Sequence, residues 1–101
     1  MMLFNAYLHY YIREKYWRSA ITLCSDELRK GRDPYINYWR GLCYFMEGST
    51  IDAIRDTEPL LNNRDFKFSA VNALIHYHNN YSIADNVSIF IYGNRTNLLD
   101  Y

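Results

Sequence analysis

The stretch GLCYFMEGSTIDAI, Gly41 to Ile54, decides the fold of this chain. It places a glycine three residues before Tyr44, then a second glycine, Gly48, and then an alanine at 53. Small residues let two helix backbones approach to the lower end of the ~8–10 Å range, and glycine commonly ends a helix. The stretch therefore predicts two helices joined by a tight turn at Gly48. We expect Gly41 to face Ala53, with Tyr44 filling the wedge beside that contact.

The same pattern occurs 33 residues earlier in the chain. The matching pairs are Tyr11 with Tyr44, Ala20 with Ala53, and Ile21 with Ile54. A period of this size, with two helices per unit, is typical of tetratricopeptide repeats. The residues expected to hold the helices of each unit together are Tyr11, Ala20, Gly41, Tyr44 and Ala53. Leu8 stands where a small residue is preferred, as in an atypical terminal repeat.

Apolar residues at helical spacing continue along most of the chain. They predict helices near 2–14, 17–30, 35–47, 50–62 and 66–79, with a weaker one near 82–92. Short connections make consecutive helices antiparallel neighbours, and Asn79-Asn80 is the expected last connection. The predicted fold is all-α: tetratricopeptide-repeat helical hairpins forming one short α-solenoid segment, with units about 2–30, 35–62 and 66–92. Residues 93–101 are expected to form a disordered tail.

Composition argues against several classes of function. Eleven Lys and Arg residues balance 11 Asp and Glu residues, so no charge attracts the chain to nucleic acid or an anionic membrane. Binding of single-stranded RNA through tyrosine stacking is disfavoured for the same reason. No run approaches the roughly 18 apolar residues that cross a bilayer, so direct membrane insertion is not expected. Cys24 and Cys43 are interpreted as buried small hydrophobes in a cytosolic, reducing compartment.

No catalytic or metal-binding constellation is apparent. His76 and His78 lie two residues apart, which places them about 200° apart around a helix, so they do not share a face as an i, i+4 pair does. No nucleophile elbow or phosphate-binding glycine loop is present. Asp52, Asp56 and Glu58 are expected on a solvated face. The sequence predicts a protein without catalytic, metal or cofactor sites.

The expected functional surface is an apolar, aromatic concave groove lined by the first helix of each unit. A contiguous patch of this kind marks a partner-binding surface, and a partner helix is one mode of binding. The residues assigned to it are Asn5, His9, Tyr38, Leu42, Phe45, Leu74 and Tyr77. The alternative, that these residues are core or are covered by a further repeat, stays open. A carboxylate clamp is disfavoured, because of these residues only Asn5 has suitable chemistry.

A narrower resemblance is carried by four motifs. The runs YYIREKYWRSAI, FMEGSTIDAI and ALIHYHN, with Asp33-Pro34 between the first two, resemble the N-terminal region of the tetratricopeptide repeat protein 21 family over roughly Tyr7 to Asn79. Residues 82–101 do not resemble the family's continuation. The resemblance implies a subunit of intraflagellar transport complex A, active in retrograde ciliary transport. It further implies other subunits as partners and a location in the cytoplasm and cilium.

Two readings follow for the whole chain. One is a non-catalytic interaction scaffold, the N-terminal solenoid segment of such a subunit; the other is a short independent adaptor that binds a peptide or partner helix in its groove. Members of the family are very long, so a fragment, a short isoform and a complete protein all remain open. A solenoid that ends in its third unit leaves that unit's apolar face uncovered. We therefore expect either self-association through the C-terminal end or marginal stability, with residues after about Asn80 poorly ordered.

Overall fold

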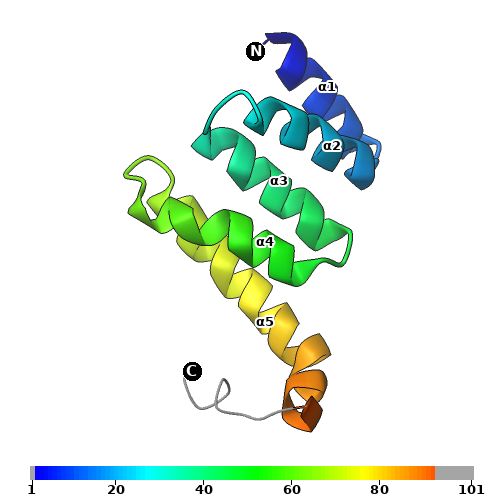
Figure 1. Ribbon diagram of the computed structural model, residues 1–101, viewed down its shortest axis with the longest axis vertical. Helices are drawn as coiled ribbons and strands as arrows, with labels where there is room; N and C mark the ends of the chain where they lie inside the picture. Colours follow the sequence, from blue (N-terminus) through cyan, green and yellow to red (C-terminus); the bar gives the residue numbers. More distant parts are fainter. Residues whose placement is uncertain (1, 93–101) are drawn as a thin grey trace.

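The computed structural model describes the backbone of residues 2–92 and the side chains of residues 3–80. Within this range the chain is all-helical, which confirms the predicted fold class. The helices succeed one another as antiparallel neighbours along the long axis of the molecule, from α1 at one end to α5 at the other (Figure 1). The elements are α1 (Met2–Arg13), α2 (Trp17–Leu28), α3 (Pro34–Met46), α4 (Thr50–Thr57), the 3₁₀ helix η1 (Glu58–Asn62) and α5 (Lys67–Tyr92).

The 33-residue period is present in the backbone as well as in the sequence. Helices α1 and α3 end at Arg13 and Met46, and α2 and α4 begin at Trp17 and Thr50. Each pair of boundaries is 33 residues apart. The starts of α3 and α5, at residues 34 and 67, have the same separation. Helices α1 and α2 are therefore the first unit, α3 and α4 with η1 are the second, and α5 begins the third.

The turns inside the two complete units also match. Lys15 and Gly48 both have positive φ, 64° and 95°. In the first turn the Tyr16 N–H donates to the Tyr11 carbonyl at 2.8 Å, and in the second the Ser49 N–H donates to the Tyr44 carbonyl at 2.8 Å. A left-handed residue followed by this six-residue hydrogen bond is the Schellman ending of a helix.

The second unit begins and ends as its residues dictate. Asp33 caps α3, because its Oδ1 accepts from the Tyr35 N–H at 3.0 Å, and Pro34 occupies the first turn, where a missing N–H costs nothing. The helix expected over 50–62 is α-helical only to Thr57 and continues as η1. Pro59 lies in the first turn of η1 and has no N–H to continue the α-helical ladder.

The third unit differs from the prediction. Two helices were expected over 66–92 with a turn at Asn79-Asn80, but α5 runs without a break from Lys67 to Tyr92. Neither glycine nor proline occurs at the predicted turn, and the Asn80 side chain donates to the His76 carbonyl one turn earlier at 3.0 Å. A side-chain bond to the carbonyl four residues earlier is compatible with an uninterrupted helix. The expected tail at 93–101 lies outside the described residues.

One buried apolar cluster lies between the first unit and α3. Its buried members are Phe4, Leu8, Ala20, Ile21, Cys24, Ile36 and Cys43. Both thiols are enclosed, and burial raises the pKa of Cys24 to about 12 and that of Cys43 to about 11. The thiols are therefore protonated at neutral pH and behave as the small apolar residues that the sequence predicts. No disulfide joins them, because both cysteines are free.

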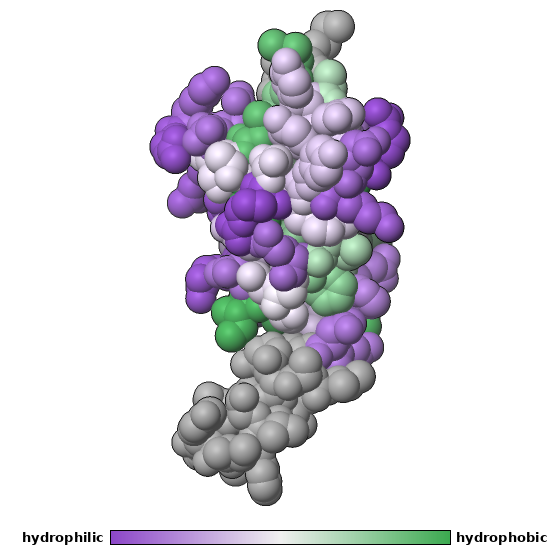
Figure 2. Space-filling view, turned by 90° about the vertical axis from the view of Figure 1, so that its right-hand side faces the viewer, coloured by the Kyte–Doolittle hydropathy of each residue, from purple (hydrophilic) through white to green (hydrophobic). Residues whose placement is uncertain are grey.

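The surface is unevenly polar. Seen from the right-hand side of Figure 1, pale and green residues form a strip along the long axis between margins of hydrophilic, purple residues (Figure 2). In the part of the chain that the structure describes, no helix is both long enough and apolar enough to cross a bilayer.

Candidate functional site

The close approach of α3 to α4 is made at Gly41. A Cβ added there would lie 2.8 Å from Thr57 Oγ1 and 3.3 Å from the Ala53 carbonyl oxygen. Ala53 is the residue that the sequence places opposite Gly41, and Thr57, one turn further along α4, lies closer still. The Thr57 hydroxyl donates back to the Ala53 carbonyl at 2.8 Å, so its polar group is satisfied inside the core.

A partly buried ion pair next to this contact was not predicted. Arg40 on α3 holds Asp56 on α4 through two bonds, Nε to Oδ2 at 2.7 Å and Nη2 to Oδ1 at 2.8 Å. Its third nitrogen donates to Ser25 Oγ on α2 at 3.0 Å, and its guanidinium lies over the Tyr44 ring. The hydrogen bonds that Arg40 donates to the Asp56 carboxylate raise the pKa of Arg40.

The placement of Asp56 corrects the sequence analysis, which expected it on a solvated face. The residue is only 7% exposed, whereas Asp52 keeps substantial exposure and pairs with Arg55. Helical spacing alone does not separate the two carboxylates, because the deciding partner, Arg40, comes from another helix. The bidentate pair joins α3 to α4, and the bond from Arg40 to Ser25 adds α2. The pair therefore has a structural role.

The first helices of the units share a face, here called the first-helix strip. In the first two units it contains His9, Tyr35, Tyr38, Leu42 and Phe45, and these residues are half-buried or exposed. In the register of the repeat, the corresponding residues of the third unit are Phe68, Val71 and Ile75, which are exposed. The strip therefore passes from α1 across α3 to α5.

Each of the first two units contributes strip residues that also contact the first helix of the next unit. His9 lies edge-on to the Trp39 ring, with centroids 5.4 Å apart, and its Nε2 is 3.4 Å from the Tyr35 hydroxyl. Phe45 stacks on Tyr77 with centroids 4.8 Å apart. The strip is thus an aromatic joint between units as well as a surface.

Two residues of the expected groove are not on this surface. Leu74 is 8% exposed and Tyr77 is 2% exposed, so both are buried. Burial also raises the pKa of the Tyr77 hydroxyl. The 33-residue register places Ile75, not Leu74, in line with Leu42, so the expected groove is one residue out of register in the third unit. The 33-residue step from His9 to Leu42, repeated once more, leads to the exposed Ile75.

The α1 end of the expected groove is polar. His9 is exposed, as a surface residue must be, and Asn5 is half-buried. The Oδ1 atom of Asn5 is buried and has no hydrogen-bond partner. A buried carbonyl oxygen without a hydrogen-bond partner carries a free-energy cost.

The remaining expected packing residues lie inside the two complete units. Ala20 and Ala53 are fully buried. Tyr11 and Tyr44 are half-buried near the intra-unit turns, where their carbonyls accept the six-residue hydrogen bonds described above. The two tyrosines therefore stand at the same place in successive hairpins.

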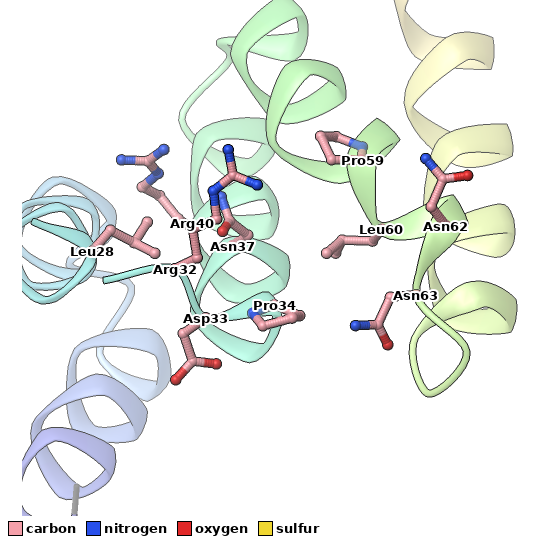
Figure 3. Close-up of a pocket in the computed structure, with 10 residues that line it drawn as sticks. All are labelled: Leu28, Arg32, Asp33, Pro34, Asn37, Arg40, Pro59, Leu60, Asn62 and Asn63. Atoms are coloured by element: carbon pink, nitrogen blue, oxygen red, sulfur yellow. The ribbon is translucent and has the colours of Figure 1, made fainter. Parts of the chain in front are cut away.

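A separate pocket lies where the connections between units approach each other (Figure 3). Its volume is about 480 Å³. Leu28, Pro34 and Leu60 supply apolar lining, and Asn37 and Asn63 supply amides. Asn63 uses its Oδ1 to accept from the Asp65 and Phe66 N–H groups at the start of α5. Arg40 in the pocket wall is already paired with Asp56.

The pocket offers hydrogen-bond donors and apolar walls. None of its lining residues is Ser, Cys or His, and its carboxylate, Asp33, is engaged in capping α3. Among the described residues, no three His, Cys, Asp or Glu side chains are placed to hold a metal ion.

Stacked helical hairpins with a 33-residue period define a helical-repeat protein of the kind that serves as an interaction scaffold. The family model "Tetratricopeptide repeat protein 21 N-terminal ARM repeat" matches residues 8–96, and the chain belongs to this family. The match includes residues 82–96, which were not expected to resemble the family. That expectation was wrong.

Individual relatives agree with the family match. The chain is 35% identical over 82 residues, 81% of its length, to the tetratricopeptide repeat protein 21 homolog of Caenorhabditis elegans. It is 29% identical over 72 residues, 70% of its length, to tetratricopeptide repeat protein 21B of Homo sapiens. The chain spans about 6% of the length of each of these two relatives. No solved structure gives a significant match.

Proposed function

We propose that the chain is a non-catalytic protein-interaction scaffold that binds a partner on its first-helix strip. The observation that carries this proposal is the continuity of apolar and aromatic residues across three successive first helices, from His9 through Leu42 to Ile75, with exposure retained along the way. A surface of this kind suits an amphipathic partner helix, because apolar side chains supply affinity and the polar margins set orientation.

The partner is proposed from family membership. In the tetratricopeptide repeat protein 21 family, the strip is proposed to contact other subunits of intraflagellar transport complex A during retrograde ciliary transport, in the cytoplasm and cilium. The near-zero net charge supports contacts that depend on shape and apolar area more than on electrostatic attraction.

The experiment is co-purification of the tagged chain from ciliated cells, followed by identification of complex A subunits. The test variant is His9→Asp with Leu42→Ala, which puts a carboxylate on the strip and shortens its centre. The control is Ile51→Asp, since Ile51 is 51% exposed on α4 and lies off the strip. We expect wild type and control to retain the subunits and the double variant to lose them severalfold.

Each part of the proposal has its own contrary outcome. Wild-type chain that retains no complex A subunit would remove the ciliary part. Equal retention by wild type and the double variant would show that binding does not use the strip. Circular dichroism of each variant checks that the helices remain folded.

A further inference from the structure

The pocket between the connections has two walls. One wall consists of the end of α2, the connection to α3 and the first turn of α3, with Leu28, Arg32 and Pro34. The other consists of η1 and the start of the connection to α5, with Leu60 and Asn63. The volume of about 480 Å³ lies within the ~300–1,000 Å³ range of ligand sites. Neither wall contains a residue of α1 or of the first-helix strip.

The η1 wall is held in place by contacts that leave a hydrogen-bond donor free. Asn63 accepts from the Asp65 and Phe66 N–H groups at 2.9 and 3.2 Å, and both bonds use its Oδ1. In Figure 3 its amide nitrogen points toward the wall that contains Pro34. Leu60 beside it is buried. Binding to a donor that is already oriented costs less conformational entropy.

The α2–α3 wall carries a guanidinium without a counter-ion. Arg32 is exposed and forms no ion pair with any side chain that the structure describes, whereas Arg40 is paired with Asp56. The carboxylate of the pocket, Asp33, accepts from the Tyr35 N–H at 3.0 Å. In Figure 3 the side chains of Arg32 and Asp33 extend to opposite sides of the connection. The Arg32 end of the pocket therefore attracts an anion.

We propose that this pocket binds an extended peptide of a partner protein that carries an acidic residue next to an apolar one. The acidic side chain pairs with Arg32, since a guanidinium can hold a carboxylate through two parallel N–H bonds. The apolar side chain lies between Pro34 and Leu60, and a backbone carbonyl of the peptide accepts from the Asn63 Nδ2. One unpaired guanidinium matches the single negative charge of a carboxylate, and an asparagine amide matches a peptide group.

The pocket is a second contact surface, which goes beyond the proposed function of the first-helix strip. Its chemistry also differs, because the strip is apolar and aromatic whereas the pocket combines a cation with amides. The two surfaces share no residue, so variants of one leave the side chains of the other unchanged. Failure of one proposal therefore does not decide the other.

The experiment uses a library of labelled hexapeptides with blocked ends, in which aspartate or glutamate stands next to each apolar residue in turn. Fluorescence polarisation with the whole chain selects a peptide that binds more tightly than about 1 mM. The variants are Arg32→Gln, which removes the charge, and Asn63→Asp, which keeps the oxygen that closes the turn and removes the donor. Arg13→Gln is the matched control, since the Arg13 side chain is 72% exposed on α1.

The expected losses of affinity follow from the exposure of each group. Arg32→Gln should weaken binding about fivefold, because an exposed ion pair is screened by solvent and salt. Asn63→Asp should weaken it about tenfold, because a carboxylate then faces the peptide carbonyl. Arg13→Gln should bind as wild type does. When the acidic residue of the peptide is changed to its amide, Arg32→Gln should have no further effect, since the pair is already broken.

A second measurement does not depend on how well the variants fold. In nitrogen-15 NMR of the wild-type chain, the side-chain amide signal of Asn63 should shift when the selected peptide is added. A library without a binder overturns the proposal, as does a peptide whose affinity is the same in wild type, Arg32→Gln and Asn63→Asp. Loss of binding in the variant His9→Asp with Leu42→Ala, but not in Arg32→Gln or Asn63→Asp, would place the peptide on the strip and also overturn it.

Discussion

The α1–α2 and α3–α4 hairpins follow the same backbone course but are closed by different side chains. The first has Leu8 where the second has Gly41, and a left-handed lysine where the second has a left-handed glycine. The second also has the Arg40–Asp56 pair, and no ion pair joins α1 to α2 among the described residues.

The difference shows how little of a repeat has to be repeated. The two alanines, Ala20 and Ala53, and the hydrogen bonds of the turn recur, and they set the path of the chain. The residue where the two helices of a unit cross, Leu8 or Gly41, can differ between units if the residues that it contacts differ as well. Leu8 is fully buried in the apolar cluster of the first unit, whereas Thr57 and the Ala53 carbonyl occupy the space in front of Gly41.

The largest expected effect concerns the cross-link present in the second hairpin alone. Asp56→Ala should lower the free energy of unfolding by about 3 kcal/mol, because it leaves the Arg40 guanidinium without its charge partner in a mostly buried place. Arg40 keeps some exposure, which limits the cost to the lower end of the usual range. Urea denaturation of both proteins measures the difference.

Asp52→Ala on the same helix is the matched control. Its partner is Arg55 and both side chains are well exposed, so its loss should cost no more than about 0.5 kcal/mol. Equal destabilisation by the two variants would mean that the Arg40–Asp56 pair adds nothing beyond an ordinary surface contact.

The next effect tests whether the crossing position is interchangeable. Gly41→Leu copies Leu8 into the second hairpin, where its Cβ would start 2.8 Å from Thr57 Oγ1. Overpacking and separation of α3 from α4 should cost about 2 kcal/mol, seen as a lower midpoint of thermal unfolding. Adding Thr57→Ala to the same chain should restore part of the loss if Thr57 is the obstacle. No recovery would place the strain at the Ala53 carbonyl instead.

Most of the two hairpins could be predicted from the sequence because their signals are local. Gly48 ends a helix, Asp33-Pro34 begins one, and small residues at fixed offsets mark a crossing. The continuous α5 could not be predicted in this way. Asn79-Asn80 favours turns in general, but the repeat position that holds Gly48 in the second unit has no glycine in the third, and Asn80 can bond within a helix.

The site was harder to predict because it depends on contacts between helices. Asp56 looks like Asp52 in the sequence, and only the position of Arg40 distinguishes them. The structure leaves His9 exposed and Leu42 half-buried, but the third-unit members of the expected groove were taken one residue early. On a helix a shift of one residue rotates a side chain by about 100°, which is enough to exchange the buried Leu74 for the exposed Ile75.

The smallest expected effect lies in the turns, where the two hairpins differ most simply. Lys15 holds φ at 64° in the turn where Gly48 holds it at 95°. A left-handed conformation costs a residue with a side chain roughly 1–2 kcal/mol, while glycine loses more backbone entropy on folding, roughly 0.5–1 kcal/mol. Lys15→Gly should therefore stabilise the chain slightly, by about 0.5 kcal/mol, and Gly48→Ala should destabilise it by about 1 kcal/mol. The two turns have the same hydrogen bonds. If thermal denaturation shows a higher midpoint for Lys15→Gly and a lower midpoint for Gly48→Ala, glycine is the preferred residue in both turns. Loss of stability in Lys15→Gly would instead mean that the lysine side chain contributes a contact that outweighs its backbone strain.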